Sequence, residues 1–332
     1  MGGNIIILLA LPTFLLASFF YFFPKFWINE LALSFSPYII LFISIIFAIT
    51  VVFFRRTIKK KGGISSKDLF FAILILLLGT LIFFYGNRIK QFYLPTQQKL
   101  TPSTNTGITL MFSNIFYKNT NTEDIIKHIN KNTPDIIAFV EFSLHHKTKL
   151  YPTLVEHYPY TNITQRSKTH AGNIVFSKYP LEDLNHQTQQ GSWRYNYIAI
   201  HHNGKKYYLY VVHTTAPISP EYFDNRNTQL IKFTQDILSQ NDESSHNART
   251  IIVGDFNITP WSAYYKKTLN TLPFNNITRY YPGLFTRYFS PIPIFQAHID
   301  HVFLSKNLRY ATLDTFQLQG SDHKGLLIKN IQ

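Results

Sequence analysis

The chain of 332 residues contains no cysteine, so disulfide bonds and thiolate metal ligands are excluded. Charged side chains are scarce as well, at 15% of the sequence, and they are missing altogether from three stretches: 1–24, 31–54 and 69–87. Beyond about residue 100 the composition becomes mixed and polar. The sequence therefore combines two parts that are adapted to different solvents.

Each uncharged stretch is as long as the roughly 20 residues that a helix needs to cross the apolar core of a bilayer. In lipid such a segment has to be helical, because every backbone N–H and C=O group needs an internal partner. We expect three transmembrane helices at about 4–23, 31–54 and 69–86. The alternatives are buried core helices and, for the first stretch, a cleaved signal peptide. Residues 1–4 lack the basic segment of a signal peptide, and no A-x-A cleavage site follows.

The basic residues between these stretches predict the topology. The segment 55–67 carries six Lys and Arg residues, whereas the segment between the first two stretches has Lys25 as its one basic residue. Basic loops remain cytoplasmic, so we expect the segment 55–67 and the N-terminus in the cytoplasm, and the remainder of the chain outside it. A nucleic-acid-binding patch is the alternative for 55–67. The sequence thus predicts a multi-pass protein of the cytoplasmic membrane with an extracytoplasmic domain.

Residues 88–106 contain Pro95 and Pro102 among Gln, Thr, Ser and Asn and show no apolar periodicity, which is typical of a linker. We therefore divide the chain into a membrane domain at 1–87, a linker at 88–106 and a folded domain at 107–332. A domain of that size can bury a sufficient core without disulfides.

The folded domain alternates between strand and helix patterns. The expected strands are 107–112, 135–140, 173–177, 195–202, 205–212, 250–253, 297–304, 310–318 and 325–329. Helices are expected after Asn121 or Thr122, over 225–239 and from near Pro260, and Asn203-Gly204 has the residues of a type I′ hairpin turn. This mixture predicts an α/β domain with mixed sheets.

Polar residues lie at the ends of several of these strands, where sheet proteins build functional sites. The residues concerned are Asn114, Glu141, His213, Asp255, Asn257, Asp300, Asp322 and His323. Each of them taken singly is more often a turn former or a helix cap, and Asp255-Phe-Asn257 could be an Asx-turn before a helix. His298-x-Asp300-His301 could indicate a transition metal, but strand alternation would place His301 on the face opposite to the other two.

Taken in order, the motifs Phe112-Ser-Asn, Pro134-Asp-Ile-Ile-Ala-Phe-Val-Glu, Gly172-Asn-Ile-Val-Phe-Ser-Lys, Val212-His, Gly254-Asp-Phe-Asn, Ile299-Asp-His and Ser321-Asp-His resemble those of the endonuclease/exonuclease/phosphatase superfamily. More narrowly, the residues after His213 and Asp255, with Arg226 downstream, resemble a bacterial membrane-anchored branch that includes a teicoplanin-resistance protein thought to act on cell-wall lipid carriers. The resemblance covers about 107–330 and implies a DNase I-like four-layer sandwich of two packed mixed sheets flanked by helices.

The resemblance also implies a role for each motif residue. Glu141, with Asn114 and Asp322, would hold Mg²⁺, for which Mn²⁺ can substitute, and a carboxylate is a suitable ligand for such a hard cation. Asp255 and Asn257 would position the nucleophile and hold the phosphate, His213 and His323 would donate to phosphoryl oxygens, and Asp300 would orient His323. Arg226 is either a clamp for a second phosphate or a surface residue of its helix.

Three functions from different classes are compatible with this pattern. The first is a hydrolase of a phosphorylated small molecule or membrane lipid, which anchoring would hold close to its substrate. The second is an extracytoplasmic nuclease, although residues 107–330 show no basic stripe with interleaved aromatic residues. The third is a catalytically dead binding module, although every motif position is filled. A Mg²⁺-dependent phosphoric ester hydrolase is the function we expect.

Overall fold

The computed structural model describes residues 2–60, 65–93, 107–162, 172–184, 195–240, 248–289 and 294–332. The chain forms two compact units, one made mainly of residues 1–94 and the other mainly of residues 95–332. The predicted linker 88–106 falls mostly outside the described residues, and its first residues belong to a helix that ends at Lys90.

The first unit is helical. Its elements are α1 (Gly2–Phe22), α2 (Trp27–Ser34), α3 (Ser36–Lys60) and α4 (Ser66–Lys90). Three of them, α1, α3 and α4, are long and apolar enough to cross a membrane. The second span begins at Ser36 and not at residue 31 as expected, because residues 31–34 complete the separate helix α2 and Phe35 ends it.

The outer surface of this unit is apolar. Leu8, Leu76 and Phe83 are 72, 69 and 67% exposed, while Leu33, Ile43 and Leu78 are buried between the helices. A water-soluble helical bundle has the opposite arrangement, with polar side chains outside. These helices therefore have the surface of membrane-spanning segments.

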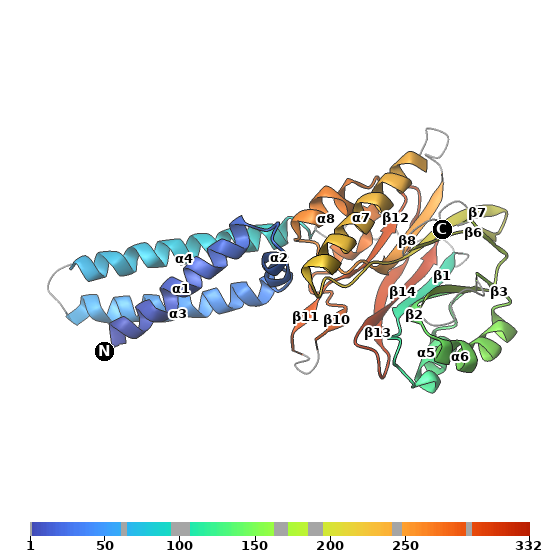
Figure 1. Ribbon diagram of the computed structural model, residues 1–332, viewed down its shortest axis with the longest axis horizontal. Helices are drawn as coiled ribbons and strands as arrows, with labels where there is room; N and C mark the ends of the chain where they lie inside the picture. Colours follow the sequence, from blue (N-terminus) through green and yellow to red (C-terminus); the bar gives the residue numbers. More distant parts are fainter. Residues whose placement is uncertain are drawn as a thin grey trace. The chain divides into compact units, whose positions relative to one another are not determined.

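The second unit contains two six-stranded sheets (Figure 1). The first has the order β13-β14-β1-β2-β4-β3, with the bounds β13 Thr312–Gln317, β14 Lys324–Ile331, β1 Ile108–Asn114, β2 Ile136–Phe142, β4 Gly172–Ser177 and β3 Tyr160–Thr161. The second has the order β5-β6-β7-β8-β12-β9, with the bounds β5 Leu181–Asp183, β6 Tyr195–His202, β7 Lys205–His213, β8 Arg249–Asp255, β12 Asp300–Leu304 and β9 Asn275–Asn276. A short ribbon pairs β10 (Arg287–Tyr288) with β11 (Gln296–Ala297).

Each large sheet has one parallel pair of strands and is otherwise antiparallel. The parallel pairs are β1 with β2 and β7 with β8. Parallel neighbours end at the same edge of a sheet, so the residues that follow β1 and β2, or β7 and β8, lie together. This topology determines where the polar strand ends meet.

The main core lies between the two sheets, where alternate strand residues such as Phe112, Ala138, Val211 and Val253 are fully buried. On the outer face of the first sheet, α5 (Thr122–Asn132) and α6 (Leu144–His157) cover a second apolar layer, whereas α7 (Pro220–Gln240) and α8 (Ala263–Lys267) lie on the side of the other sheet (Figure 1). The predicted fold, two packed mixed sheets flanked by helices and preceded by three long apolar helices, is confirmed.

Local signals in the sequence are also found in the structure. Asn121 caps α5, since its side chain accepts a hydrogen bond from the backbone N–H of Asp124. Asn203 and Gly204 have φ angles of 50° and 70°, as a type I′ turn requires. The expected strand 297–304 is shorter, because Gln296 and Ala297 pair with β10 and regular pairing with β8 begins at Asp300.

Candidate functional site

The site is built at the carboxyl ends of the two parallel strand pairs. Asn114 is the last residue of β1, and Glu141 is the penultimate residue of β2. His213 and Asp255 end β7 and β8 and lie opposite each other in the register of the second sheet. The face-to-face packing of the sheets brings these four side chains together.

Two residues of the site have backbone conformations that non-glycine residues rarely adopt. Glu141 has a φ angle of 59° and Asn257 one of 47°. At Glu141 the pairing of β2 with β4 is interrupted between Phe139 and Phe142, which turns the Glu141 side chain out of the regular alternation. Such conformations cost about 1–3 kcal/mol each and are concentrated at functional sites.

Asn114 connects the carboxylates of the two sheets. Its amide Nδ2 donates to Glu141 Oε1 at 2.9 Å and to Asp255 Oδ2 at 3.1 Å. Its Oδ1 accepts from the backbone N–H of Phe116, and Glu141 Oε2 accepts from the backbone N–H of Tyr117. In this arrangement Asn114 holds Glu141 and Asp255 at a fixed separation.

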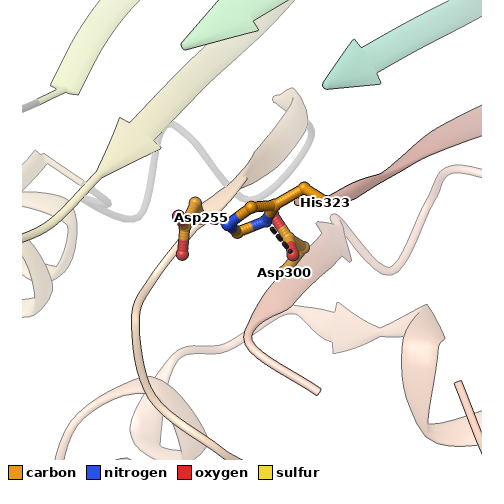
Figure 2. Close-up of side chains that lie close together, drawn as sticks. All are labelled: Asp255, Asp300 and His323. Atoms are coloured by element: carbon orange, nitrogen blue, oxygen red, sulfur yellow. Dashed lines mark hydrogen bonds and ion pairs between the residues drawn. The ribbon is translucent and has the colours of Figure 1, made fainter. Parts of the chain in front are cut away.

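Asp255, His323 and Asp300 form a buried row in which the imidazole lies between two carboxylates (Figure 2). His323 Nδ1 lies 3.0 Å from Asp300 Oδ2, and His323 Nε2 lies 3.5 Å from Asp255 Oδ2. The backbone N–H of Asn257 donates to Asp255 Oδ1. His213 is close by, with its Nε2 3.7 Å from Glu141 Oε1 and 3.9 Å from Asp255 Oδ2.

Burial and charge shift the pKa values of this row. Burial alone would lower the pKa of His323, but the carboxylates of Asp300 and Asp255 more than offset it and raise the pKa to about 9. Burial raises the pKa of Asp255, and the neighbouring His323 opposes that rise. The raised pKa favours the protonated form of His323, in which the imidazolium has a proton to donate.

The donor atoms of Asp255, Asp300 and His323 all lie within 4.8 Å of one another, close enough for ligands of a single metal ion. Each ring nitrogen of His323 faces a carboxylate, however, which is the geometry of an imidazole oriented by hydrogen bonding. The Glu141 carboxylate is 19% exposed, which leaves room beside it for the waters that Mg²⁺ retains when it binds.

Arg226 and Asp322 lie apart from this row. Arg226 is 1% exposed, so the interpretation as a surface residue is wrong. Its Nη1 donates to the backbone carbonyl of Asn257 at 2.8 Å, and its Nε donates to Asn227 Oδ1. Asp322 forms an ion pair with Arg287 at 3.2 Å, a partner that the sequence did not indicate.

The expectation that His298 and His301 lie on opposite faces is wrong. Their rings stack with centroids 4.7 Å apart, because regular strand structure begins only at Asp300 and alternation does not extend back to His298. Both residues are fully buried, and His301 Nε2 lies 2.9 Å from the carbonyl oxygen of Ile258.

Solved structures with the same architecture support the fold. TDP2 from D. rerio in complex with a single-strand DNA product has a TM-score of 0.54 at 15% identity, over 68% of this chain and 99% of that one. The catalytic domain of human Nocturnin with bound sulfate has a TM-score of 0.50 at 18% identity, over 69% and 95%. The 3′ phosphatase NExo from Neisseria, bound to a product DNA hairpin, has a TM-score of 0.50 at 17% identity, over 67% and 99%.

No curated protein matches the chain. The model of the endonuclease/exonuclease/phosphatase family matches residues 111–323, a range that begins in β1 and ends at His323. This range contains every polar strand end described above. The chain therefore belongs to the endonuclease/exonuclease/phosphatase family.

Proposed function

We propose that this protein is a membrane-anchored, divalent-cation-dependent phosphoesterase that hydrolyses a phosphate ester or diphosphate of a lipid or cell-envelope substrate. The observation that carries the proposal is the meeting of Glu141, His213, Asp255 and the Asp300–His323 pair at one edge of the two sheets. These groups match the needs of phosphoryl transfer, which are positioning of water and neutralisation of charge.

The cation would be held by Glu141, whose carboxylate has lone pairs beyond those used by Asn114 and Tyr117. A divalent cation there would neutralise charge on the phosphoryl oxygens of the substrate. Asn114 contributes by fixing the Glu141 carboxylate, because its Nδ2 donates to that group while its Oδ1 is turned toward Phe116. The ion pair of Asp322 with Arg287 favours a role for Asp322 outside the cation shell.

The other groups supply protons and orientation. Asp255 would accept a proton from the attacking water, since burial raises its pKa and favours uptake of a proton. His323 would donate to a phosphoryl or leaving oxygen, with Asp300 fixing the ring. His213 would donate from the opposite side, close to Glu141. Asn257 donates one amide N–H to the carbonyl of Thr214 at 2.9 Å, and the second N–H of the same amide would donate to a phosphate oxygen.

The membrane-spanning helices support a membrane substrate, because anchoring raises the effective concentration of a lipid for a site on the same chain. A nuclease is the alternative, since the structures of TDP2 and NExo contain bound DNA. Full-length protein in detergent with Mg²⁺ should be offered lipid phosphates, lipid diphosphates, phospholipids and DNA side by side. Phosphate release from lipids without nicking of DNA is the expected result, and nicking alone would favour the nuclease.

Metal removal tests the same proposal. Hydrolysis should stop in EDTA and return with Mg²⁺ or Mn²⁺, and Glu141→Gln should lose activity because an amide is a weaker ligand for a hard cation. Glu182→Gln is the matched control, since Glu182 lies on the edge strand β5 and forms an exposed ion pair with Lys206. Full activity in EDTA would contradict the assignment of a divalent cation to Glu141.

A further inference from the structure

Arg287 is held beside the Asp300–His323 pair by backbone pairing. Arg287 and His323 form an isolated β-bridge. On either side of it, the N–H of Tyr288 donates to the carbonyl of Asp322 at 2.8 Å, and the N–H of Lys324 donates to the carbonyl of Thr286 at 2.7 Å. The hydroxyl of Thr286 in turn accepts from the backbone N–H of Asp300. The position of Arg287 relative to the reacting groups is therefore fixed by main-chain contacts.

The side chain of Arg287 lies at the rim of the site. Its Nη2 pairs with Asp322, and these two side chains are 25 and 30% exposed, whereas His323 and Asp300 are at most 1% exposed. The Nε atom of Arg287 is buried and has no hydrogen-bond partner among the described residues. A buried N–H without a partner is costly, and a native structure usually supplies an acceptor.

The charge of Arg287 acts on the centre of the site. It lowers the pKa of Asp255, after the larger effects of burial, His323 and Asp300. It also lowers the pKa of His323, after the larger effects of burial and of the two carboxylates. The surrounding side chains include four acidic groups, Glu141, Asp255, Asp300 and Asp322. These carboxylates repel a substrate that carries several negative charges. Such a substrate needs positive groups in addition to the divalent cation that we assign to Glu141.

We propose that Arg287 binds a second phosphate group, next to the phosphoryl group that is attacked, so that the site is specific for diphosphates. This inference rests on the proposed phosphoesterase function. The attacked phosphorus would lie over the buried row, and the second phosphate would reach the rim, where a planar guanidinium can hold two of its oxygens. Asp322 holds the guanidinium at the rim in the meantime.

The reaction then has a defined course. Water adds to the attacked phosphorus and loses a proton to Asp255, and the bond from that phosphorus to the bridging oxygen breaks. The electron pair stays on the bridging oxygen, which leaves with the second phosphate. The charge that develops there is opposite in sign to that of Arg287, which therefore stabilises the transition state more than the ground state.

The test uses full-length protein in detergent and two matched pairs of substrates. One pair is a prenyl diphosphate with its monophosphate, and the other is a nucleoside 5′-diphosphate with its monophosphate, so that lipid and soluble sources are distinguished. Arg287→Gln should lower kcat/KM for diphosphates by about 10- to 100-fold, the range for a hydrogen bond to a charged group, and change it for monophosphates far less. Arg287→Lys should retain part of the activity on diphosphates, because lysine keeps the positive charge but lacks the planar guanidinium that can hold two oxygens.

Arg249→Gln is the matched control, since Arg249 begins β8 at the opposite end of that strand from Asp255. It should leave the preference for diphosphates unchanged. An equal loss on diphosphates and monophosphates in Arg287→Gln, or no loss on either, would overturn the proposal.

Binding of inorganic phosphate ions gives a readout that does not depend on turnover. Pyrophosphate should protect the wild type against thermal unfolding at lower concentration than orthophosphate, and Arg287→Gln should remove that difference. Asp322→Asn should strengthen pyrophosphate binding, because it removes a competing negative charge. If no phosphoester is hydrolysed, the proposed function fails while this binding test still decides the role of Arg287; equal binding by wild type and Arg287→Gln would refute that role.

Discussion

At the scale of single residues, the contact between Asp300 and His323 separates a catalytic pair from two structural side chains. If Asp300 orients the imidazole, the pair acts as a unit, and losing either member costs nearly as much as losing both. We expect Asp300→Asn, His323→Gln and the double variant each to lose on the order of 10²–10⁴ in turnover, the range for a positioned acid or base.

Both side chains are buried, so these changes will also lower the free energy of unfolding, and turnover must be measured per folded molecule. Asp314→Asn is a suitable control, because Asp314 forms an exposed ion pair with Lys329. If the losses in turnover of the two single variants add up in the double variant, or if unfolding explains them wholly, Asp300 and His323 do not act as a catalytic pair.

The raised pKa of His323 predicts the alkaline limit of activity. If protonated His323 donates to the substrate, turnover should fall as the pH rises through about 9. Asp300→Asn removes one of the two carboxylates that raise the pKa of His323, whereas burial still lowers that pKa. The alkaline limit should then move to lower pH.

The same shift contributes to stability with a definite sign. Because the pKa of His323 is raised in the folded state, this contribution is complete below the ordinary histidine pKa of 6.5 and is lost as the pH rises through about 9. Profiles of kcat against pH for both proteins test the assignment. An unchanged alkaline limit in Asp300→Asn would assign that limit to another group.

At the scale of elements, α7 supports the turn that follows β8. Arg226 of α7 is buried and donates to the carbonyl of Asn257, whose N–H donates to Asp255 and whose amide donates to the carbonyl of Thr214. The Arg226 guanidinium thereby supports the turn after β8, which Asn257 ties to the residue that follows β7. This geometry favours a positioning role for Arg226 over the phosphate clamp that the sequence left open.

A kinetic split distinguishes the two roles. Arg226→Met should lower kcat by on the order of 10²-fold through small displacements of Asp255 and Asn257, with little change in KM. Lys232→Met, on the exposed face of the same helix, should have no effect. A raised KM with unchanged kcat would instead support a direct role of Arg226 in binding a phosphate of the substrate.

Elements with strong local signals were predictable, and those that depend on distant partners were not. The strands that carry Asn114, Glu141, His213 and Asp255 are apolar runs ended by polar residues, a pattern visible in the sequence. The two-residue strand β10 is too short for any periodicity, so its pairing with His323, and with it Arg287, escaped the sequence analysis. The burial of Arg226 was equally hidden, because it depends on a carbonyl 31 residues away.

At the scale of the whole molecule, the chain joins a helical unit with an apolar surface to an α/β unit of the endonuclease/exonuclease/phosphatase family. The charges around the helices bear on orientation. The end of α3 and the segment after it carry Arg55, Arg56, Lys59, Lys60 and Lys61, and Lys67 lies in the first turn of α4, whereas the segment between α1 and α3 contains Lys25 with Glu30. This asymmetry predicts a cytoplasmic 55–67 segment.

With three spans, a cytoplasmic 55–67 segment requires that α4 leave the cytoplasm and that the α/β unit lie outside it. A reporter that is active only outside the cytoplasm should therefore give signal when fused after Gln332 and none when inserted near Gly62. Replacing the six basic residues of 55–67 with Gln should weaken or mix the orientation, because their charge sets it. Replacing Lys205, Lys206 and Lys232 is the matched control, since these residues belong to the α/β unit and should leave the orientation intact. Signal near Gly62 with none after Gln332 would place the site in the cytoplasm and contradict the predicted topology.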